Sequence, residues 1–323
     1  VKGPGATAFL DWFTCNALPK VGRINLTYAL TDAGTTRTEY TIVRLKEHEY
    51  YLISAGAWTA YDADFLIKSA EDFMTQGGGY IDIHDVTTQW GVYALAGPNA
   101  RALLKDIVKD ADPETVLGNK RFPWLSYRDI ELGMCPVRAV RVAYTGELGW
   151  ELHYPIEFGR YLWDLIWSVG EKHGLKGVGA RAQNWLRQEK SYRAFGNELG
   201  RDATPLEAAL DRFVDLNKEF NGKAKMLETG VRSKCCTLLI DGPADTDPWG
   251  KEALLLDGKK VGRLTSGGYS VAFGKQIGMG YVRPDLAEPG TKLKVKILRQ
   301  EWDAVVTEDS PYDPSNAVIR KDG

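Results

Sequence analysis

Apolar residues recur along this chain with two periods, and each period predicts one kind of element. Alternation of apolar and polar positions predicts strands of a meander at 24–28, 39–45 and 50–53. Helical spacing of apolar residues predicts helices at 58–76 and 157–173. Weaker patterns predict strands at 81–86, 91–95, 124–130 and 137–143, a helix at 99–110 and a helix-rich block at 177–196. The first 230 residues therefore mix strands with helices.

The pattern changes near residue 231. From there on, short strands alternate with turns rich in Gly, Asp and Pro, at 236–240, 252–256, 260–264, 278–282, 293–298 and 303–306. This predicts a small antiparallel β-barrel of about 80 residues. We therefore expect two domains, residues 1–230 and 231–323. Within the barrel we expect Gly267-Gly268-Tyr269 at a turn that approaches a ligand or the other domain, and after Thr307 a polar tail that is either strapped down or frayed.

A Gly-Pro pair opens two of the predicted helices. Gly3-Pro4 and Gly97-Pro98 are each followed by alanine and leucine at matching positions, and proline suits the first turn of a helix. In the second copy a full strand, 91–95, leads into the helix, whereas only two residues precede the first copy. We expect a pseudo-duplicated βα unit whose first strand is truncated, in a fragment of a longer polypeptide. The alternative is a coincidental pair of helix starts.

Composition and spacing argue against several classes of partner. The chain has 323 residues, 44% of them hydrophobic, and a net charge of −2 without a long basic run, which disfavours nucleic acid. No apolar run approaches the roughly 18 residues that span a bilayer, so no membrane partner is expected. The cysteines and histidines lack metal-binding spacing, so no metal site is expected. The four cysteines are predicted to be reduced core thiols, in the cytoplasm or, in a eukaryote, the mitochondrial matrix.

One stretch, residues 142–152, combines a predicted hairpin with candidate chemistry. It is strand-like at both ends and turns in the middle, where Gly146 accepts backbone angles that other residues resist. Tyr144 and Glu151 then lie at the ends of adjacent strands. A phenol and a carboxylate on a rigid hairpin can hydrogen-bond a flat heterocycle that offers N–H donors. The alternative is a surface hairpin with an incidental acid.

The same stretch carries a resemblance to a known family. Tyr-Thr-Gly-Glu-x-Gly-x-Glu, at 144–151, resembles the signature of the aminomethyltransferase (glycine-cleavage T-protein) family, and in particular the C-terminal tetrahydrofolate domain of dimethylglycine and sarcosine dehydrogenases and oxidases. Further segments match in family order over nearly the whole chain, at 18–22, 186–196, 204–208 and 265–270. The resemblance implies an α+β fold of antiparallel sheets with flanking helices plus a C-terminal antiparallel β-barrel, arranged around a central opening.

The resemblance also implies a tetrahydrofolate site. Glu151 would accept hydrogen bonds from the pterin, with Tyr144 packed beside it. Glu39 matches an aspartate that the family places next to N10, and it is the expected catalytic residue; glutamate reaches one methylene further, and an exposed strand-end acid is the alternative. Leu26 and Ile53 match positions that line the pterin, although the pattern alone makes them core residues.

The helix-rich block after residue 177 contains the arginines. Arg181 is the candidate folate-contacting arginine, but it lies two residues further from Leu186-Arg187 than the family pattern has it, so the identity of this arginine stays open. Arg187 and Glu189 are expected in a buried polar network. Further on, Thr204-Pro205 with Glu207 is typical of a helix that starts with a capping box.

The implied reaction is the assembly of a one-carbon bridge on tetrahydrofolate. Formaldehyde or an iminium from a demethylated amine would be condensed to 5,10-methylenetetrahydrofolate. The chain has no Gly-x-Gly-x-x-Gly strand–helix unit, so FAD is expected in a missing N-terminal domain or a partner subunit. The alternatives are the folate domain of a trimethylamine N-oxide demethylase, a tetrahydrofolate-dependent O- or S-demethylase, and a non-catalytic interaction module.

Overall fold

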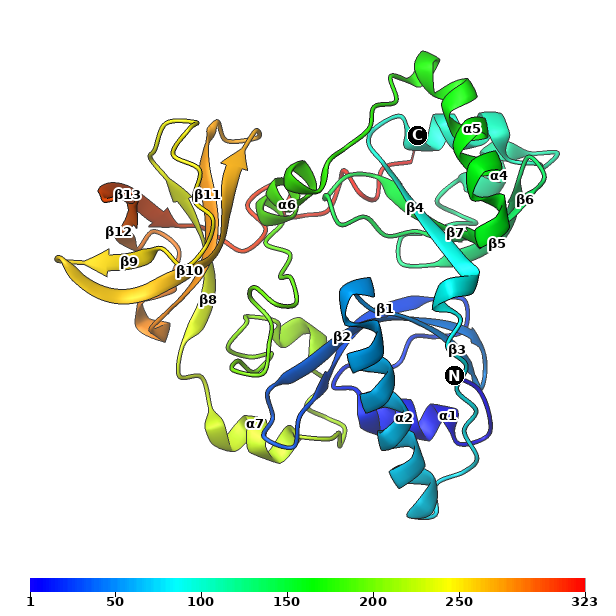
Figure 1. Cartoon of the computed structure of the whole chain (residues 1–323), viewed down its shortest axis with the longest axis horizontal. Coiled ribbons are helices and arrows are strands. Elements are labelled where there is room, and N and C mark those ends of the chain that lie inside the picture. Colours follow the sequence, from blue (N-terminus) through cyan, green and yellow to red (C-terminus); the bar gives the residue numbers. More distant parts are fainter. Residues whose placement is uncertain (323) are drawn as a thin grey trace.

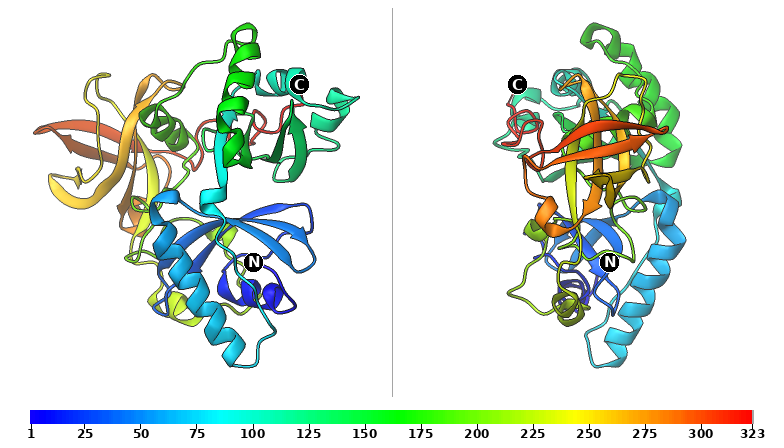
Figure 2. Two further views of the ribbon diagram at one scale, coloured as in Figure 1. Left: turned by 45° about the vertical axis from the view of Figure 1, so that its right-hand side comes forward. Right: turned by 90° about the vertical axis from the view of Figure 1, so that its left-hand side faces the viewer.

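The computed structural model describes residues 1–322 and has three lobes (Figures 1 and 2). The first lobe is a three-stranded antiparallel sheet of β1 (Ile24–Leu30), β2 (Thr36–Lys46) and β3 (Glu49–Ile53). Helices α1 (Ala6–Phe13) and α2 (Thr59–Thr75) share a core with Ala29 of β1 and with alternate residues of β2 and β3, and so cover one face. The predicted meander and the helix at 58–76 are confirmed.

The second lobe is a four-stranded antiparallel sheet in the order β4-β7-β6-β5. Its strands are β4 (Trp90–Ala96), β5 (Tyr127–Leu132), β6 (Cys135–Val140) and β7 (Gly149–Pro155). Helices α3 (Ala100–Ile107), α4 (Pro113–Leu117) and α5 (Gly159–Gly170) pack on one face around the buried Trp150. As in the first lobe, the opposite face of the sheet carries no helix from its own lobe.

These two sheets share one order of elements. In the second lobe β4 leads into α3 and pairs with β7, and the meander β5-β6-β7 leads into α5. In the first lobe Lys2 precedes α1 and bridges Glu49 of β3, and the meander β1-β2-β3 leads into α2. The expected strand at 81–86 is wrong, because only Asp82 pairs there, in an isolated bridge with Lys2.

The two lobes join where β1 and β5 begin. Arg23 bridges Ser126, and the Ile24 amide donates to the Leu125 carbonyl at 3.1 Å. The helix-free faces then share a small core, built on the buried Ile24, Val43 and Val140. Consequently, side chains near this junction that point away from α1 and α2 lie between the lobes, whereas Tyr28 and Leu30 of β1 pack on residues 199–226.

The third lobe is a closed six-stranded barrel in the order β10-β11-β8-β13-β12-β9. Its strands are β8 (Lys234–Ile240), β9 (Ala253–Leu256), β10 (Lys259–Ser270), β11 (Lys275–Val282), β12 (Lys292–Ile297) and β13 (Gln300–Val306). Together with the two sheets it confirms the α+β fold with a C-terminal barrel. Gly267-Gly268-Tyr269 lies inside β10, so the expected turn is wrong; the expected close approach is present, because a Cβ at Gly268 would collide with Trp185.

Two further helices and the C-terminal tail connect the lobes. Helix α6 (Ala180–Glu189) lies between the barrel and the second lobe, and α7 (Lys223–Thr229) lies beside the first (Figure 1). The tail runs from the barrel to the second lobe, where the Asn119 amide donates to the Arg320 carbonyl at 2.7 Å. It is therefore strapped down and not frayed. Within residues 1–322 no helix has the length and apolarity needed to cross a membrane.

Candidate functional site

The helix-free face of the first sheet gathers three of the predicted site residues. Directly opposed residues of an antiparallel pair point to the same face. Tyr28 of β1 opposes Glu39 of β2, and Thr41 of β2 opposes both Leu26 and Ile53. Since residues 39 and 41 also share a face, Leu26, Glu39 and Ile53 form neighbouring rows of one surface.

Glu151 points from the second sheet toward the same region. It opposes Ala94 of β4 and Val140 of β6. Val140 packs against Ile24 and Val43 of the first sheet, so this face of β7 is turned toward the first lobe. The two predicted carboxylates therefore lie on the facing surfaces of two sheets.

Glu39 and Tyr144 line one cavity of about 220 Å³. Tyr144 reaches it from the loop between β6 and β7, where its ring stacks on Tyr192 at 6.1 Å and its hydroxyl donates to the Arg193 carbonyl at 3.3 Å. The other lining residues are Thr38, Ala55, Trp58, Asp62, Ala194 and Phe195. The cavity thus has walls from both sheet lobes and from the segment after α6.

The environment of Glu39 changes its protonation. Burial raises the pKa of this carboxyl to about 7, although a hydrogen bond from Tyr28 and the positive charge of Arg187 oppose the rise. Near neutral pH both the acid and the carboxylate are populated. Glu39 can therefore accept a proton and return it, which is what general acid–base catalysis requires.

Glu151 has a different environment, because its carboxylate keeps a partner and partial access to solvent. Its side chain is 31% exposed, and Oε2 lies 3.2 Å from Nε2 of the buried His153. His153 Nδ1 lies 3.1 Å from the hydroxyl of Tyr51, which belongs to β3 of the first lobe. This carboxylate is built to accept hydrogen bonds on its open side.

The structure places Arg181 elsewhere. Its guanidinium forms an ion pair with Asp247 of the barrel and lies over the rings of Trp185 and Trp249, at 5.3 and 5.8 Å. The side chain is 59% exposed and does not line the cavity of Glu39 and Tyr144. Arg181 is thus the one predicted site residue that the fold does not bring to the space between the sheets.

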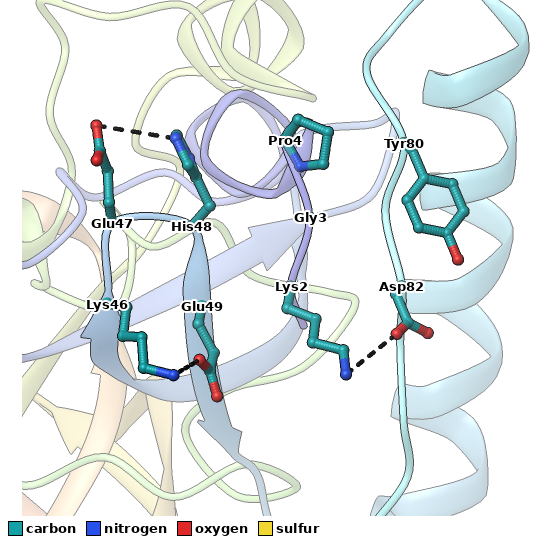
Figure 3. A pocket seen from close by; sticks show the side chains of 9 residues that line it. All are labelled: Lys2, Gly3, Pro4, Lys46, Glu47, His48, Glu49, Tyr80 and Asp82. Carbon is teal, nitrogen blue, oxygen red and sulfur yellow. Dashed lines mark ion pairs between the residues drawn. The ribbon is translucent and has the colours of Figure 1, made fainter.

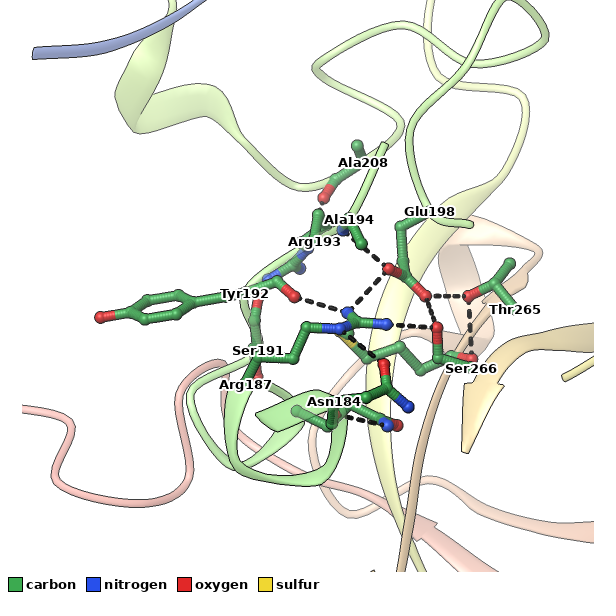
Figure 4. A network of polar contacts seen from close by, with 12 residues as sticks. Asn184, Arg187, Ser191, Tyr192, Arg193, Ala194, Glu198, Ala208, Thr265 and Ser266 are labelled. Carbon is green, nitrogen blue, oxygen red and sulfur yellow. Dashed lines mark hydrogen bonds and ion pairs between the residues drawn. The ribbon is translucent and has the colours of Figure 1, made fainter. Parts of the chain in front are cut away.

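Arg187 lies in a buried polar network, as predicted (Figure 4). It donates to Glu198 at 2.9 Å and to the hydroxyl of Ser266 at 2.6 Å, and the Thr265 hydroxyl donates to Glu198 at 2.7 Å. Glu189 accepts from the Ser270 hydroxyl at 2.6 Å. These bonds join the segment around α6 to β10 of the barrel and so hold the wall that carries Ala194 and Phe195.

Sequence reasoning missed Tyr28, Tyr51, Asp62 and His153. A signal for Tyr28 was present, because a hairpin turning at residues 31–34 places it opposite Glu39. Asp62 carried no signal, since only the packing of α2 against the end of β2 brings it into the cavity. The contact of Tyr51 with His153 joins residues 102 positions apart and needs both lobes.

A wider hollow of about 420 Å³ lies on the outer side of the first lobe (Figure 3). Its lining residues are Lys2, Gly3, Pro4, Lys46, Glu47, His48, Glu49, Tyr80 and Asp82. Its lysines are engaged in ion pairs, Lys2 with Asp82 at 3.4 Å and Lys46 with Glu49 at 2.8 Å. It contains none of the predicted site residues, so the candidate site remains the space between the sheets.

Metal and thiol chemistry receive no support from the described residues. Among residues 1–322 no cluster of three or more His, Cys, Asp or Glu side chains is arranged to hold a metal ion. All four cysteines are buried, and burial raises the pKa of Cys15 and Cys135 to about 11 and that of Cys235 and Cys236 to about 12. Such thiols stay protonated and are poor nucleophiles.

Comparison with known proteins decides the family. The model of the GCVT N-terminal domain matches residues 1–218. The chain belongs to the aminomethyltransferase family. The family model of the glycine cleavage T-protein C-terminal barrel domain matches residues 234–313 of the same chain. The crystal structure of glycine cleavage system aminomethyltransferase T from Bartonella henselae superposes with a TM-score of 0.82 at 24% identity, covering 99% of this chain and 83% of that one, which shows the shared fold.

Curated relatives of this chain include a dehydrogenase and an aminomethyltransferase. The chain is 33% identical to the mitochondrial dimethylglycine dehydrogenase of Rattus norvegicus over its whole length, but it spans only 37% of that protein. It is 29% identical to the aminomethyltransferase of Natranaerobius thermophilus, with 97% of this chain and 83% of that one covered. The resemblance predicted from the sequence motifs is confirmed.

Proposed function

We propose that this chain binds tetrahydrofolate between its two sheets and transfers a one-carbon unit to it. The observation that carries the proposal is the pair of carboxylates on facing sheets. Glu39 is half-buried with a pKa raised to about 7, whereas Glu151 is half-buried with a hydrogen bond to His153. Two carboxyl groups in such different environments suit two different tasks, proton transfer and ligand binding.

The residues present fit a pterin. A flat ring with N–H donors needs an acceptor at its edge and apolar contacts along its faces. Glu151 supplies the acceptor, since a carboxylate has two oxygens that only accept. Leu26 and Ile53 are partly buried apolar residues on the opposing surface, and Tyr144 adds an aromatic side chain. The four residues together would hold the ring and orient it toward Glu39.

Tetrahydrofolate, when bound, supplies the nucleophilic nitrogens N5 and N10 that take up the one-carbon unit. The chain holds these atoms near Glu39 and excludes water with Trp58 and Phe195, which line the same cavity. Glu39 as carboxylate accepts a proton from a reacting nitrogen and as acid returns it to the departing water or amine. Positioning and proton transfer together are the expected contributions of the protein, and the proposed product is 5,10-methylenetetrahydrofolate.

The source of the one-carbon unit belongs to the same proposal. The dimethylglycine dehydrogenase relatives are longer proteins, of which this chain matches about a third. We therefore assign the chain the folate half of a methylamine demethylation. The oxidation that produces formaldehyde or an iminium, and the FAD that it needs, would reside in a separate N-terminal domain or a partner subunit.

Titration calorimetry with tetrahydrofolate tests the proposal. The wild-type chain is compared with Glu151→Ala and with Glu131→Ala, which alters an exposed glutamate of the same sheet that is paired with Lys109. We expect micromolar binding that Glu151→Ala weakens tenfold or more and Glu131→Ala leaves unchanged. Absence of binding by folded wild-type protein would overturn the proposal. Equal binding by all three proteins would place the pterin elsewhere.

A further inference from the structure

Two hydrogen bonds in series connect Glu151 of the second lobe, through His153, to Tyr51 of the first lobe. His153 Nε2 lies 3.2 Å from Glu151 Oε2, and Nδ1 of the same ring lies 3.1 Å from the Tyr51 hydroxyl. His153 is only 1% exposed. Glu151 and His153 belong to β7 of the second lobe, whereas Tyr51 belongs to β3 of the first.

For a neutral His153 ring, the chemistry of the three groups sets the direction of both bonds. A carboxylate only accepts hydrogen bonds, so Nε2 of His153 must carry the proton that points at Glu151. In the neutral ring Nδ1 is then an acceptor, and the Tyr51 hydroxyl must donate to it. Burial raises the pKa of Tyr51, so that hydroxyl keeps its proton. Tyr51 therefore supports the tautomer that Glu151 requires and holds the His153 ring in the orientation that reaches Glu151.

Packing keeps Tyr51 in place. Its ring meets His153 edge to face, with centroids 5.6 Å apart and an interplanar angle of 82°, and contacts Trp90 at 6.2 Å. The Arg138 guanidinium lies 5.3 Å from the centre of the Tyr51 ring and is itself fixed by two bonds to Asp129, at 2.9 and 3.1 Å. The Tyr51 hydroxyl, which is the first donor of this hydrogen-bond series, is thus held in place by contacts on several sides of its ring.

We propose that Tyr51 and His153 are positioning residues that orient the Glu151 carboxylate for a ligand presenting two neighbouring N–H donors. His153 occupies one side of Oε2 and leaves Oε1 and the rest of Oε2 to the ligand. Tyr51 of the first lobe thereby helps to orient the Glu151 carboxylate of the second lobe. The inference rests on the proposed function, since it concerns how the same site recognises a pterin.

Removal of a single hydroxyl tests the inference. Tyr51→Phe keeps the ring and its packing but deletes the donor, and we expect the Kd for tetrahydrofolate to rise roughly threefold to tenfold, the range of one hydrogen bond. In a Glu151→Gln background the same change should have almost no effect, because coupled residues are not additive. The rate at saturating folate should stay unchanged in Tyr51→Phe.

Tyr50→Phe is the matched control. It removes a hydroxyl from the neighbouring residue of β3, which points to the opposite face of the sheet and lies 2.9 Å from the Thr7 hydroxyl. We expect no change in folate affinity from it. Thermal unfolding of both variants shows whether each is folded. ¹⁵N spectra of the His153 ring should show protonated Nε2 in both the wild type and Tyr51→Phe, and the Nδ1 signal should shift in Tyr51→Phe because that nitrogen loses its donor.

The outcomes separate this inference from the proposed function. If the wild type binds folate and Glu151→Gln weakens binding while folded Tyr51→Phe binds like the wild type, the positioning chain is wrong and the folate site stands. Additive losses in the double variant would also overturn it. If the wild type does not bind folate, the proposed function fails first, and the His153 spectra still report whether Tyr51 donates to Nδ1.

Discussion

The two sheet lobes have the same order of strands and helices, but they treat their carboxylates in opposite ways. The first lobe half-buries Glu39 with Tyr28 beside it, and desolvation raises its pKa to about 7. The second leaves Glu151 31% exposed and gives it a hydrogen bond to His153. The difference shows that topology alone does not assign function. The neighbours of each carboxylate make one suited to moving a proton and the other to accepting hydrogen bonds.

The largest expected effect separates these two tasks. Glu39→Gln removes the group that transfers the proton, so single-turnover formation of methylenetetrahydrofolate from formaldehyde should slow by about 10²–10⁴-fold. The Kd for tetrahydrofolate should change little. Glu151→Gln should do the reverse and raise the Kd while sparing much of the rate at saturation. If both variants lost affinity and rate equally, the contrast between the lobes would collapse.

The raised pKa of Glu39 should make the free energy of unfolding depend on pH. The folded protein binds the Glu39 proton more tightly than the unfolded chain does, since the pKa rises from 4.5 to about 7. The free energy of unfolding should therefore fall as pH rises across that window and level off above it. Glu39→Gln should stabilise the fold by roughly 3 kcal/mol at pH 8 and very little at pH 4.5. Urea denaturation at the two pH values checks this, with Glu131→Gln as the exposed control.

The same pKa predicts how the rate depends on pH. If the carboxylate form of Glu39 accepts the proton, the active fraction grows from about a tenth at pH 6 to about nine tenths at pH 8. The rate at saturating folate should then rise close to tenfold over this interval, and the rise should vanish in Glu39→Gln. A rate that falls with pH would assign Glu39 the role of acid instead.

The comparison also shows what the sequence could and could not predict. Alternating positions predict the meander of the first lobe, although they do not all pack on the helices. In β2 and β3 they include the residues buried against α1 and α2, whereas Ile24, Leu26 and Tyr28 of β1 lie on the opposite face. Glu39, Tyr144 and Glu151 were found through short motifs. Their convergence was not predictable from periodicity, since it depends on the junction where Arg23 bridges Ser126 and turns the two helix-free faces toward each other.

Local signals failed where tertiary packing decided the outcome. Thr204 and Glu207 make both capping-box bonds, at 2.9 and 3.1 Å, but no α-helix follows, and Ala209 adopts a left-handed φ of 55°. Gly267-Gly268 resembles a turn, but the missing side chains instead let β10 approach Pro248 and Trp185. In both places the residues make the local contacts typical of their motif, but packing against a neighbouring segment determines which secondary structure forms.

Substitution of Arg181 should have the smallest effect on folate affinity and stability, and it tests whether this arginine belongs to the site. Its guanidinium is 59% exposed and paired with Asp247, and such surface pairs contribute about 0–1 kcal/mol. Arg181→Met should therefore change the free energy of unfolding by less than about 1 kcal/mol and leave the folate Kd as it is. Arg187→Met is the contrasting variant, because it leaves Glu198 buried without its cation and should destabilise by about 3–5 kcal/mol. A tenfold loss of folate affinity in a stable Arg181→Met would instead return this arginine to the folate site, and would mean that ligand binding draws it away from the barrel.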